Sequence, residues 1–318
     1  MTSEQLTLEN RPTTAPNVHV AHHFESAQQQ FDAGKLGMWL FLVTEVLFFS
    51  GLFVAYAVYR GNHPEVFVDA HKYLNTTLGT LNTIVLLLSS LTMAWAVRCA
   101  QLSQQRGLVL LLATTLACAS LFLGVKAVEY SHKWGEGLLW AGAYAGEVAH
   151  SADVDQQIFR ALIILCLPTM LALLVSAIGL GNSLRGGSKH SMTRKLWGSL
   201  VVAAIAYFAG VGIGQAVEHF SSPAYDPEIH LHNNELHAAE TTEAETFTGV
   251  FFSIYYAMTG VHAIHILAGM GVIVWLLRRS IRGDFGADYF GPVDYVGLYW
   301  HLIDLVWIYL YPLLYLIR

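Results

Sequence analysis

The sequence predicts an all-α fold, an integral membrane bundle of seven transmembrane helices. Hydrophobic residues make up 54% of the 318 residues and charged residues only 13%, whereas soluble domains carry about 25% charged residues. Seven apolar runs follow one another along the chain, each near the roughly 20 residues that a helix needs to cross a bilayer. The runs are 38–59, 76–97, 107–128, 159–181, 197–217, 247–277 and 293–316.

The first run, 38–59, contains a single charged residue, Glu45, and is flanked by Lys35 and Arg60. The two long cations can reach the membrane interfaces, which places the ends of the span beside them. A charge inside a span is costly, and it tends to mark a bundle interior or a functional site. Residues 1–33 before it are polar and contain no apolar signal-peptide core. We therefore expect a cytoplasmic tail and no cleavable leader.

The distribution of Lys and Arg among the connections indicates the orientation. With the N-terminus placed inside, the inner segments hold eleven of these residues and the outer segments five, while Lys126 lies near a helix end. Cytoplasmic connections carry an excess of Lys and Arg. The sequence therefore predicts a cytoplasmic N-terminus and a periplasmic C-terminus.

The fifth run is followed by an outer connection of unusual composition. Residues 221–246 hold six acids, three histidines and no Lys or Arg, a composition that favours a solvated loop.

Gly210 and Gly214 on the fifth run are a small-xxx-small pair, which lets two helices approach closely. The three cysteines lie in or beside apolar runs without C-x-x-C spacing, so we interpret them as core residues. They are Cys99, Cys118 and Cys166.

Seven ionisable residues lie in or at the ends of the apolar runs. His262 and His265 are three apart and share a helix face, as do His301 and Asp304. We interpret the set as a buried polar cluster, either proton-linked or structural. Its members are Glu45, Lys126, Glu129, His262, His265, His301 and Asp304.

Other interpretations of these seven residues remain open. An intramembrane acid can stay protonated and simply hydrogen-bond a neighbouring helix, and for Glu45 we weigh this equally against a proton-linked role. Histidines ligate metals and haem, but too few further ligands are available, so no metal site is predicted. The pair His301 and Asp304 is expected to bury its polarity within one helix. No phosphate loop, catalytic triad or nucleic-acid surface is present in the sequence.

Five motifs, taken together, resemble the subunit III family of cytochrome c oxidase, within the haem–copper oxidases. They occur in family order and cover roughly 34–140 and 246–318. The motifs are Lys35–Trp39 leading into Glu45–Phe49, then Leu81–Thr83, Lys126–Lys133, Thr259–His265 and Tyr299–Trp307.

The resemblance implies an accessory subunit without catalytic residues or a cofactor of its own. Such a subunit packs on the catalytic subunit I and other oxidase subunits, which hold haem and copper and pass electrons from cytochrome c to oxygen. It binds phospholipid, supports proton uptake and lies in the bacterial plasma (inner) membrane as a multi-pass protein. Glu45 matches the family's buried acid. Arg278, Arg279 and Arg282 match a basic helix end that contacts lipid phosphate, a geometry that suits the arginine fork.

The chain departs from the family pattern in two ways. It lacks two N-terminal helices that some members have. Residues 141–245 are interpreted as an insertion that carries a helix pair and the acidic outer loop. A basic cytochrome c would be steered by that loop. Two alternatives stay open: a subunit III-like protein of a quinol oxidase or nitric oxide reductase, and a free-standing proton-coupled transporter using Glu45. The transporter is disfavoured because the sequence shows no discontinuous helix pair.

Overall fold

The computed structural model is all-helical over the residues that it describes, which are 20–141, 154–186, 191–221 and 241–317. Seven of the described helices are long and apolar enough to cross a membrane, so the chain is a multi-pass membrane bundle. They are α1 (Ala27–Asn62), α3 (Thr76–Gln101), α4 (Gln105–Gly135), α5 (Val154–Arg185), α6 (Ser191–Ser221), α8 (Thr241–Arg282) and α9 (Gly291–Tyr315). Between α1 and α3 lie the short α2 (Pro64–Ala70) and a 3-10 turn, His71–Tyr73.

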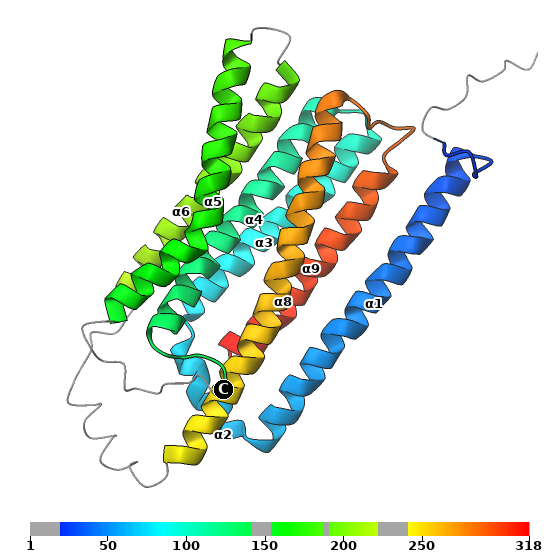
Figure 1. Cartoon of the computed structure of the whole chain (residues 1–318). Coiled ribbons are helices and arrows are strands. Elements are labelled where there is room, and N and C mark those ends of the chain that lie inside the picture. The colour runs from blue at the N-terminus through cyan, green and yellow to red at the C-terminus, as the bar shows by residue number, and fades with distance from the viewer. Residues whose placement is uncertain (1–19, 142–153, 187–190, 222–240, 318) are drawn as a thin grey trace, which may run out of the picture.

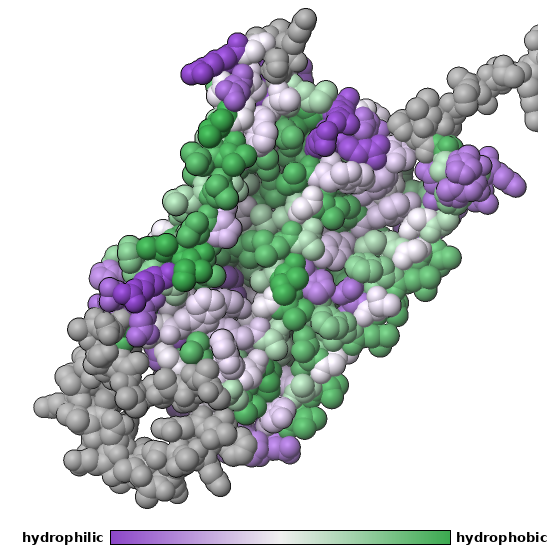
Figure 2. All heavy atoms as spheres, viewed as in Figure 1, coloured by the Kyte–Doolittle hydropathy of each residue, from purple (hydrophilic) through white to green (hydrophobic). Residues whose placement is uncertain are grey.

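Helices α3, α4, α8 and α9 form the centre of the bundle, and the other long helices flank it (Figure 1). On one side α1 packs on α9 and α8; on the other, α6 packs mainly on α4, and α5 on both. The surface between the two ends is largely apolar, while hydrophilic residues gather toward the ends (Figure 2). This pattern suits a protein whose side is solvated by lipid.

Most of the long helices extend beyond the predicted apolar runs, and three of these extensions change an expectation. Helix α1 begins at Ala27, so residues 27–33 of the expected polar tail are helical; the Ser26 hydroxyl caps the helix by accepting from the Gln29 amide at 3.1 Å. Helix α4 continues to Gly135, which places Glu129 inside a helix rather than at its end. Helix α8 begins at Thr241, inside the segment expected to be a loop. In each case a helix continues beyond the bilayer-sized apolar run, because polar residues also form helix where backbone bonds are satisfied.

The contact between α4 and α6 brings two helix backbones together. A Cβ added to Gly124 would lie 2.1 Å from the Tyr207 carbonyl oxygen, and one added to Gly210 would lie 2.3 Å from the Leu121 carbonyl oxygen. Gly214 is less tightly placed, since its Cβ would lie 3.0 Å from Val128. The small-residue prediction for this helix is confirmed at Gly210. The partner glycine, Gly124, is on α4.

The three cysteines are free thiols, as expected, with Cys99 buried and Cys118 and Cys166 half-buried. The central helices enclose most of the apolar core. Its largest fully buried side chains include Trp300, Trp307 and Phe122. Ionisable groups among these side chains have no water to solvate them, so protein neighbours must do so.

Candidate functional site: polar pairs inside the bundle

Glu45 and His265 join α1 to α8. The carboxylate oxygen Oε2 of Glu45 lies 2.9 Å from His265 Nε2, and both side chains are less than one-fifth exposed. On the other side of the ring, His265 Nδ1 lies 2.8 Å from the Val261 carbonyl oxygen. A carbonyl only accepts, so Nδ1 donates, and one proton lies between Nε2 and the carboxyl group. The pair is therefore a proton-sharing link between two helices.

Aromatic side chains surround this link. The His265 ring centroid lies 5.1 Å from that of Phe49 and 6.2 Å from that of Phe48, both on α1. From α9, the Tyr299 hydroxyl donates to the His265 carbonyl oxygen at 3.0 Å. Three helices therefore meet at His265, and the aromatic rings shield the Glu45–His265 link from water.

His262 does not belong to this link. It is fully buried, and its ring packs 5.2 Å from Trp307 and 5.8 Å from Phe122. Neither of its ring nitrogens has a hydrogen-bond partner among the described residues. Of the two histidines that sequence analysis places on one helix face, only His265 therefore contacts Glu45. Three residues along a helix are about 300° of rotation, and this offset turns His262 to the bundle interior while His265 faces α1.

Lys126 and Glu129 form a second, fully enclosed pair. Lys126 Nζ lies 3.0 Å from Glu129 Oε2, and the two side chains are 5% and 0% exposed. Two tyrosine hydroxyls complete the network: Tyr255 of α8 and Tyr315 of α9 donate to Glu129 Oε1 at 2.6 and 2.5 Å. Lys126 Nζ also lies 3.2 and 2.9 Å from these two hydroxyl oxygens. Every charged atom therefore has a partner, as a buried pair requires.

Aromatic faces also surround the ammonium group of Lys126. Its Nζ lies 5.2 Å from the ring centroids of both Tyr255 and Trp307, and 5.3 Å from that of Tyr130. A cation over an aromatic face is attracted by the ring quadrupole. The network thus ties α4, α8 and α9 together. Sequence analysis missed Tyr255 and Tyr315, although Tyr255 lies seven residues before His262 and so shares its helix face.

His301 and Asp304 are not the intrahelical pair that the sequence predicts. His301 Nδ1 lies 2.7 Å from the Ser90 hydroxyl oxygen on α3. The carboxyl group of Asp304 is buried beside the same serine, but neither of its oxygens has a hydrogen bond of normal geometry among the described residues. The nearby tryptophans also bond to α3: Trp300 donates to Ser89 at 2.9 Å and Trp307 to Thr83 at 3.1 Å. Both tryptophans are fully buried.

The three arginines at the end of α8 differ in their surroundings. Arg279 Nε lies 2.8 Å from Asp284 Oδ2, and its guanidinium lies 5.0 to 5.5 Å from the rings of Phe285, Trp275 and Tyr289. Arg279 therefore holds the connection between α8 and α9. Arg278 and Arg282 are exposed at the same helix end.

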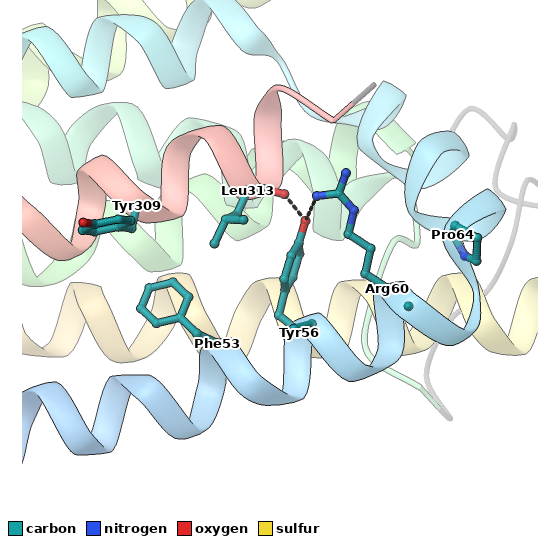
Figure 3. A pocket seen from close by; sticks show the side chains of 8 residues that line it. Phe53, Tyr56, Arg60, Pro64, Tyr309 and Leu313 are labelled. Atoms are coloured by element: carbon teal, nitrogen blue, oxygen red, sulfur yellow. Dashed lines mark hydrogen bonds between the residues drawn. The ribbon is translucent and has the colours of Figure 1, made fainter.

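A groove of about 640 Å³ runs between the end of α1 and the end of α9 (Figure 3). Phe53, Tyr309 and Leu313 give it apolar walls, and Arg60 lies at its rim. The Arg60 guanidinium donates to the Tyr56 hydroxyl at 3.1 Å, and that hydroxyl donates to the Leu313 carbonyl oxygen. The groove is thus apolar along its length and carries a fixed cation at one end.

Among the described residues, no group of three His, Cys, Asp or Glu side chains is arranged to hold a metal ion. The ionisable side chains instead divide into pairs and networks between helices. Two such sites stand out, the Glu45–His265 link and the Lys126–Glu129 network. Both lie in segments that belong to the motifs found in the sequence.

Comparison with known proteins identifies those segments. The family model described as "Cytochrome c oxidase subunit III" matches residues 15–136 and 230–317. Subunit 3 of cytochrome c oxidase from Thermostichus vulcanus is 38% identical over 71 residues, 22% of this chain and 35% of that protein. The Synechocystis subunit 3 is 40% identical over 71 residues, 22% and 30% of the two chains. The "Heme-copper oxidase subunit I+III" of Aeropyrum pernix is 34% identical over 70 residues, 22% and 9%.

These alignments span about a third or less of the length of the curated relatives. The family model extends much further and leaves residues 137–229 unmatched, the stretch that carries α5 and α6. Its two segments cover about two thirds of the sequence and contain both interhelical polar sites. The chain belongs to the cytochrome c oxidase subunit III family.

Proposed function

We propose that this chain is the accessory, cofactor-free subunit of an oxygen-reducing haem–copper oxidase, packed beside the catalytic subunit. The Glu45–His265 link is the observation that carries the proposal furthest. It pairs an acid and an imidazole from the two matched segments, deep in apolar helices, and shares one proton between them. Such a link sets how α1 packs and can take up or release a proton beside a partner that consumes protons.

The catalytic subunit is the proposed partner for a specific reason. The name of the Aeropyrum relative joins subunits I and III, which supports direct association of the two in that protein. In this chain α1 presents a long apolar face, with side chains such as Leu40 and Leu47 more than three-fifths exposed. A face of this kind is stable against lipid or against another membrane helix.

Phospholipid binding is proposed at two places. At the α8 end, the exposed Arg278 and Arg282 supply cations for a lipid phosphate, whereas Arg279 is engaged by Asp284. The second place is the groove beside Arg60, where α1 ends. Its apolar walls suit a lipid acyl chain, and its cation suits the lipid headgroup.

The electron donor, the orientation and the role of the inserted segment belong to the same proposal. We infer a cytochrome c donor, a cytoplasmic N-terminus and a bacterial inner membrane. Of the inserted pair, α6 packs on α4 through the glycine contact, and α5 packs on both. The acidic residues of 222–240, which would attract a basic cytochrome c, lie outside the described residues.

Affinity purification of the tagged chain from its native membranes tests the proposal. Haem-containing subunits should co-purify, and a reduced-minus-oxidised spectrum should show haem in the complex. The isolated chain should show no Soret band. A stoichiometric Soret band in the isolated chain would contradict the cofactor-free assignment. Haem of another type, without a cytochrome c-oxidising partner, would favour a quinol oxidase or nitric oxide reductase. Purification without partners, together with proton-coupled flux in vesicles, would favour a transporter.

A further inference from the structure

Three polar side chains in the centre of the bundle are closed to water and lack well-formed hydrogen bonds, although the Asp304 carboxyl group lies beside Ser90. Asn82 of α3 and His262 of α8 are 0% exposed, and Asp304 of α9 is 3% exposed. The amide, ring and carboxyl atoms of these three side chains all lack a hydrogen bond of normal geometry within the described part of the chain. Each comes from a different helix.

His262 contacts Trp307, and the other two side chains are close to this residue in the sequence of α9 or through its partner on α3. The His262 ring centroid lies 5.2 Å from that of Trp307, and Asp304 lies one turn earlier on the same helix. The Trp307 indole donates to Thr83 at 3.1 Å, the residue next to Asn82. Phe122 closes the other side of both rings, at 4.9 Å from Trp307 and 5.8 Å from His262.

Satisfied polar layers lie on both sides of this group. Toward the end of α9, the Lys126–Glu129 network uses all of its donors, and Lys126 Nζ lies 5.2 Å from the Trp307 ring. Toward the start of α9, His301 bonds to Ser90 and Trp300 to Ser89. Among the central helices, these three side chains therefore lie between two levels at which neighbouring polar groups are hydrogen-bonded.

A buried polar group without a partner costs about 1–3 kcal/mol, and such groups in folded proteins are commonly bonded to internal water, which makes about three hydrogen bonds to polar side chains. We propose that Asn82, His262 and Asp304 form an internal water-binding site, and that Asp304 exchanges its carboxyl proton through this water. The described surroundings of Asp304 offer no cation, and an ionised carboxylate without one would be strongly disfavoured. In this exchange one proton leaves the Asp304 carboxyl group and another replaces it.

Infrared spectroscopy of the full-length chain, purified with its native partners, tests this site. A protonated Asp304 gives a carboxylic acid C=O band, which is assigned by its loss in Asp304→Asn. On transfer to D₂O we expect this band to shift within minutes. The absence of an Asp304-dependent acid band, or a band that stays unshifted for many hours, would overturn the proposal, because the acid would then be ionised or dry.

A matched pair of variants on α3 tests whether the three groups share the water. Asn82→Leu keeps the side-chain shape and removes both polar atoms, so the exchange at Asp304 should slow by about tenfold or more as the site loses hydration. Val85→Leu, an apolar change one turn away, should leave the exchange rate unchanged. An equal rate in wild type and Asn82→Leu would rule out a shared site. Should Asn82→Leu fail to assemble, the wild-type D₂O shift still decides whether Asp304 contacts water.

Discussion

Lys126 and Glu129 form an ion pair that no water reaches, with Nζ 3.0 Å from Oε2 and the side chains 5% and 0% exposed. The charges are compensated by each other, by the hydroxyl groups of Tyr255 and Tyr315, and by the aromatic rings around Lys126. Removing one charge would therefore leave the other without solvation. A buried pair is weak evidence for net stability, but half of such a pair is strongly unfavourable.

Lys126→Met should lower the free energy of unfolding by about 3–5 kcal/mol, because Glu129 would then be a buried, unpaired acid. The double variant Lys126→Met/Glu129→Gln should be more stable than this single variant. Lys72→Met is the matched control, since Lys72 and Asp69 have the same i,i+3 spacing but are 65% and 72% exposed; its effect should stay below about 1 kcal/mol. Denaturant titration in mixed micelles measures all three. Equal effects of the two lysine variants would contradict the argument.

Gly124→Ala should weaken the contact between α4 and α6. A Cβ at Gly124 would lie 2.1 Å from a backbone oxygen, and backbone cannot move aside as a flexible side chain can. Forcing extra volume into such a contact costs about 1–3 kcal/mol. Gly212→Ala, on α6 with nothing within 4 Å of the added carbon, should be neutral or slightly stabilising. Thermal denaturation of the two variants provides the comparison, and a Gly124→Ala protein as stable as Gly212→Ala would show that the helices are not in backbone contact.

Glu45→Gln should retain the link to His265, because the glutamine amide can donate to Nε2. The haem spectrum of the purified complex should remain intact, since we propose that this subunit holds no cofactor. Glu45→Leu removes the hydrogen bond and should destabilise the chain by about 1–3 kcal/mol. Thr44→Val is a matched control one residue away, because the Thr44 hydroxyl donates only to Phe41 of its own helix and is exposed. Complete loss of haem from the Glu45→Gln complex would mean that this acid organises a cofactor.

The sequence determines the positions of the helices more fully than it determines which side chains contact each other. Hydropathy predicted all seven long helices, because the requirement for a bilayer-length apolar run is local. It also singled out Glu45 and His265, since a charge in an apolar run is conspicuous. Which of His262 and His265 faces α1 depends on how α8 is rotated in the bundle, and spacing alone does not fix that rotation. Likewise Tyr255 and Tyr315 carry no charge, so nothing local distinguishes them from ordinary apolar packing.

Arg278 and Arg279 are adjacent but should respond differently to substitution. Arg279 is paired with Asp284 and packed against three aromatic rings, so Arg279→Leu should release the connection between α8 and α9 and increase its cleavage by protease. Arg278 is exposed and has no such packing role, so Arg278→Leu should leave cleavage unchanged and reduce the anionic phospholipid that co-purifies, measured by mass spectrometry. If Arg279→Leu instead removed the lipid and left the connection resistant, the lipid phosphate would be bound by Arg279 and the division of roles proposed for the two arginines would be reversed.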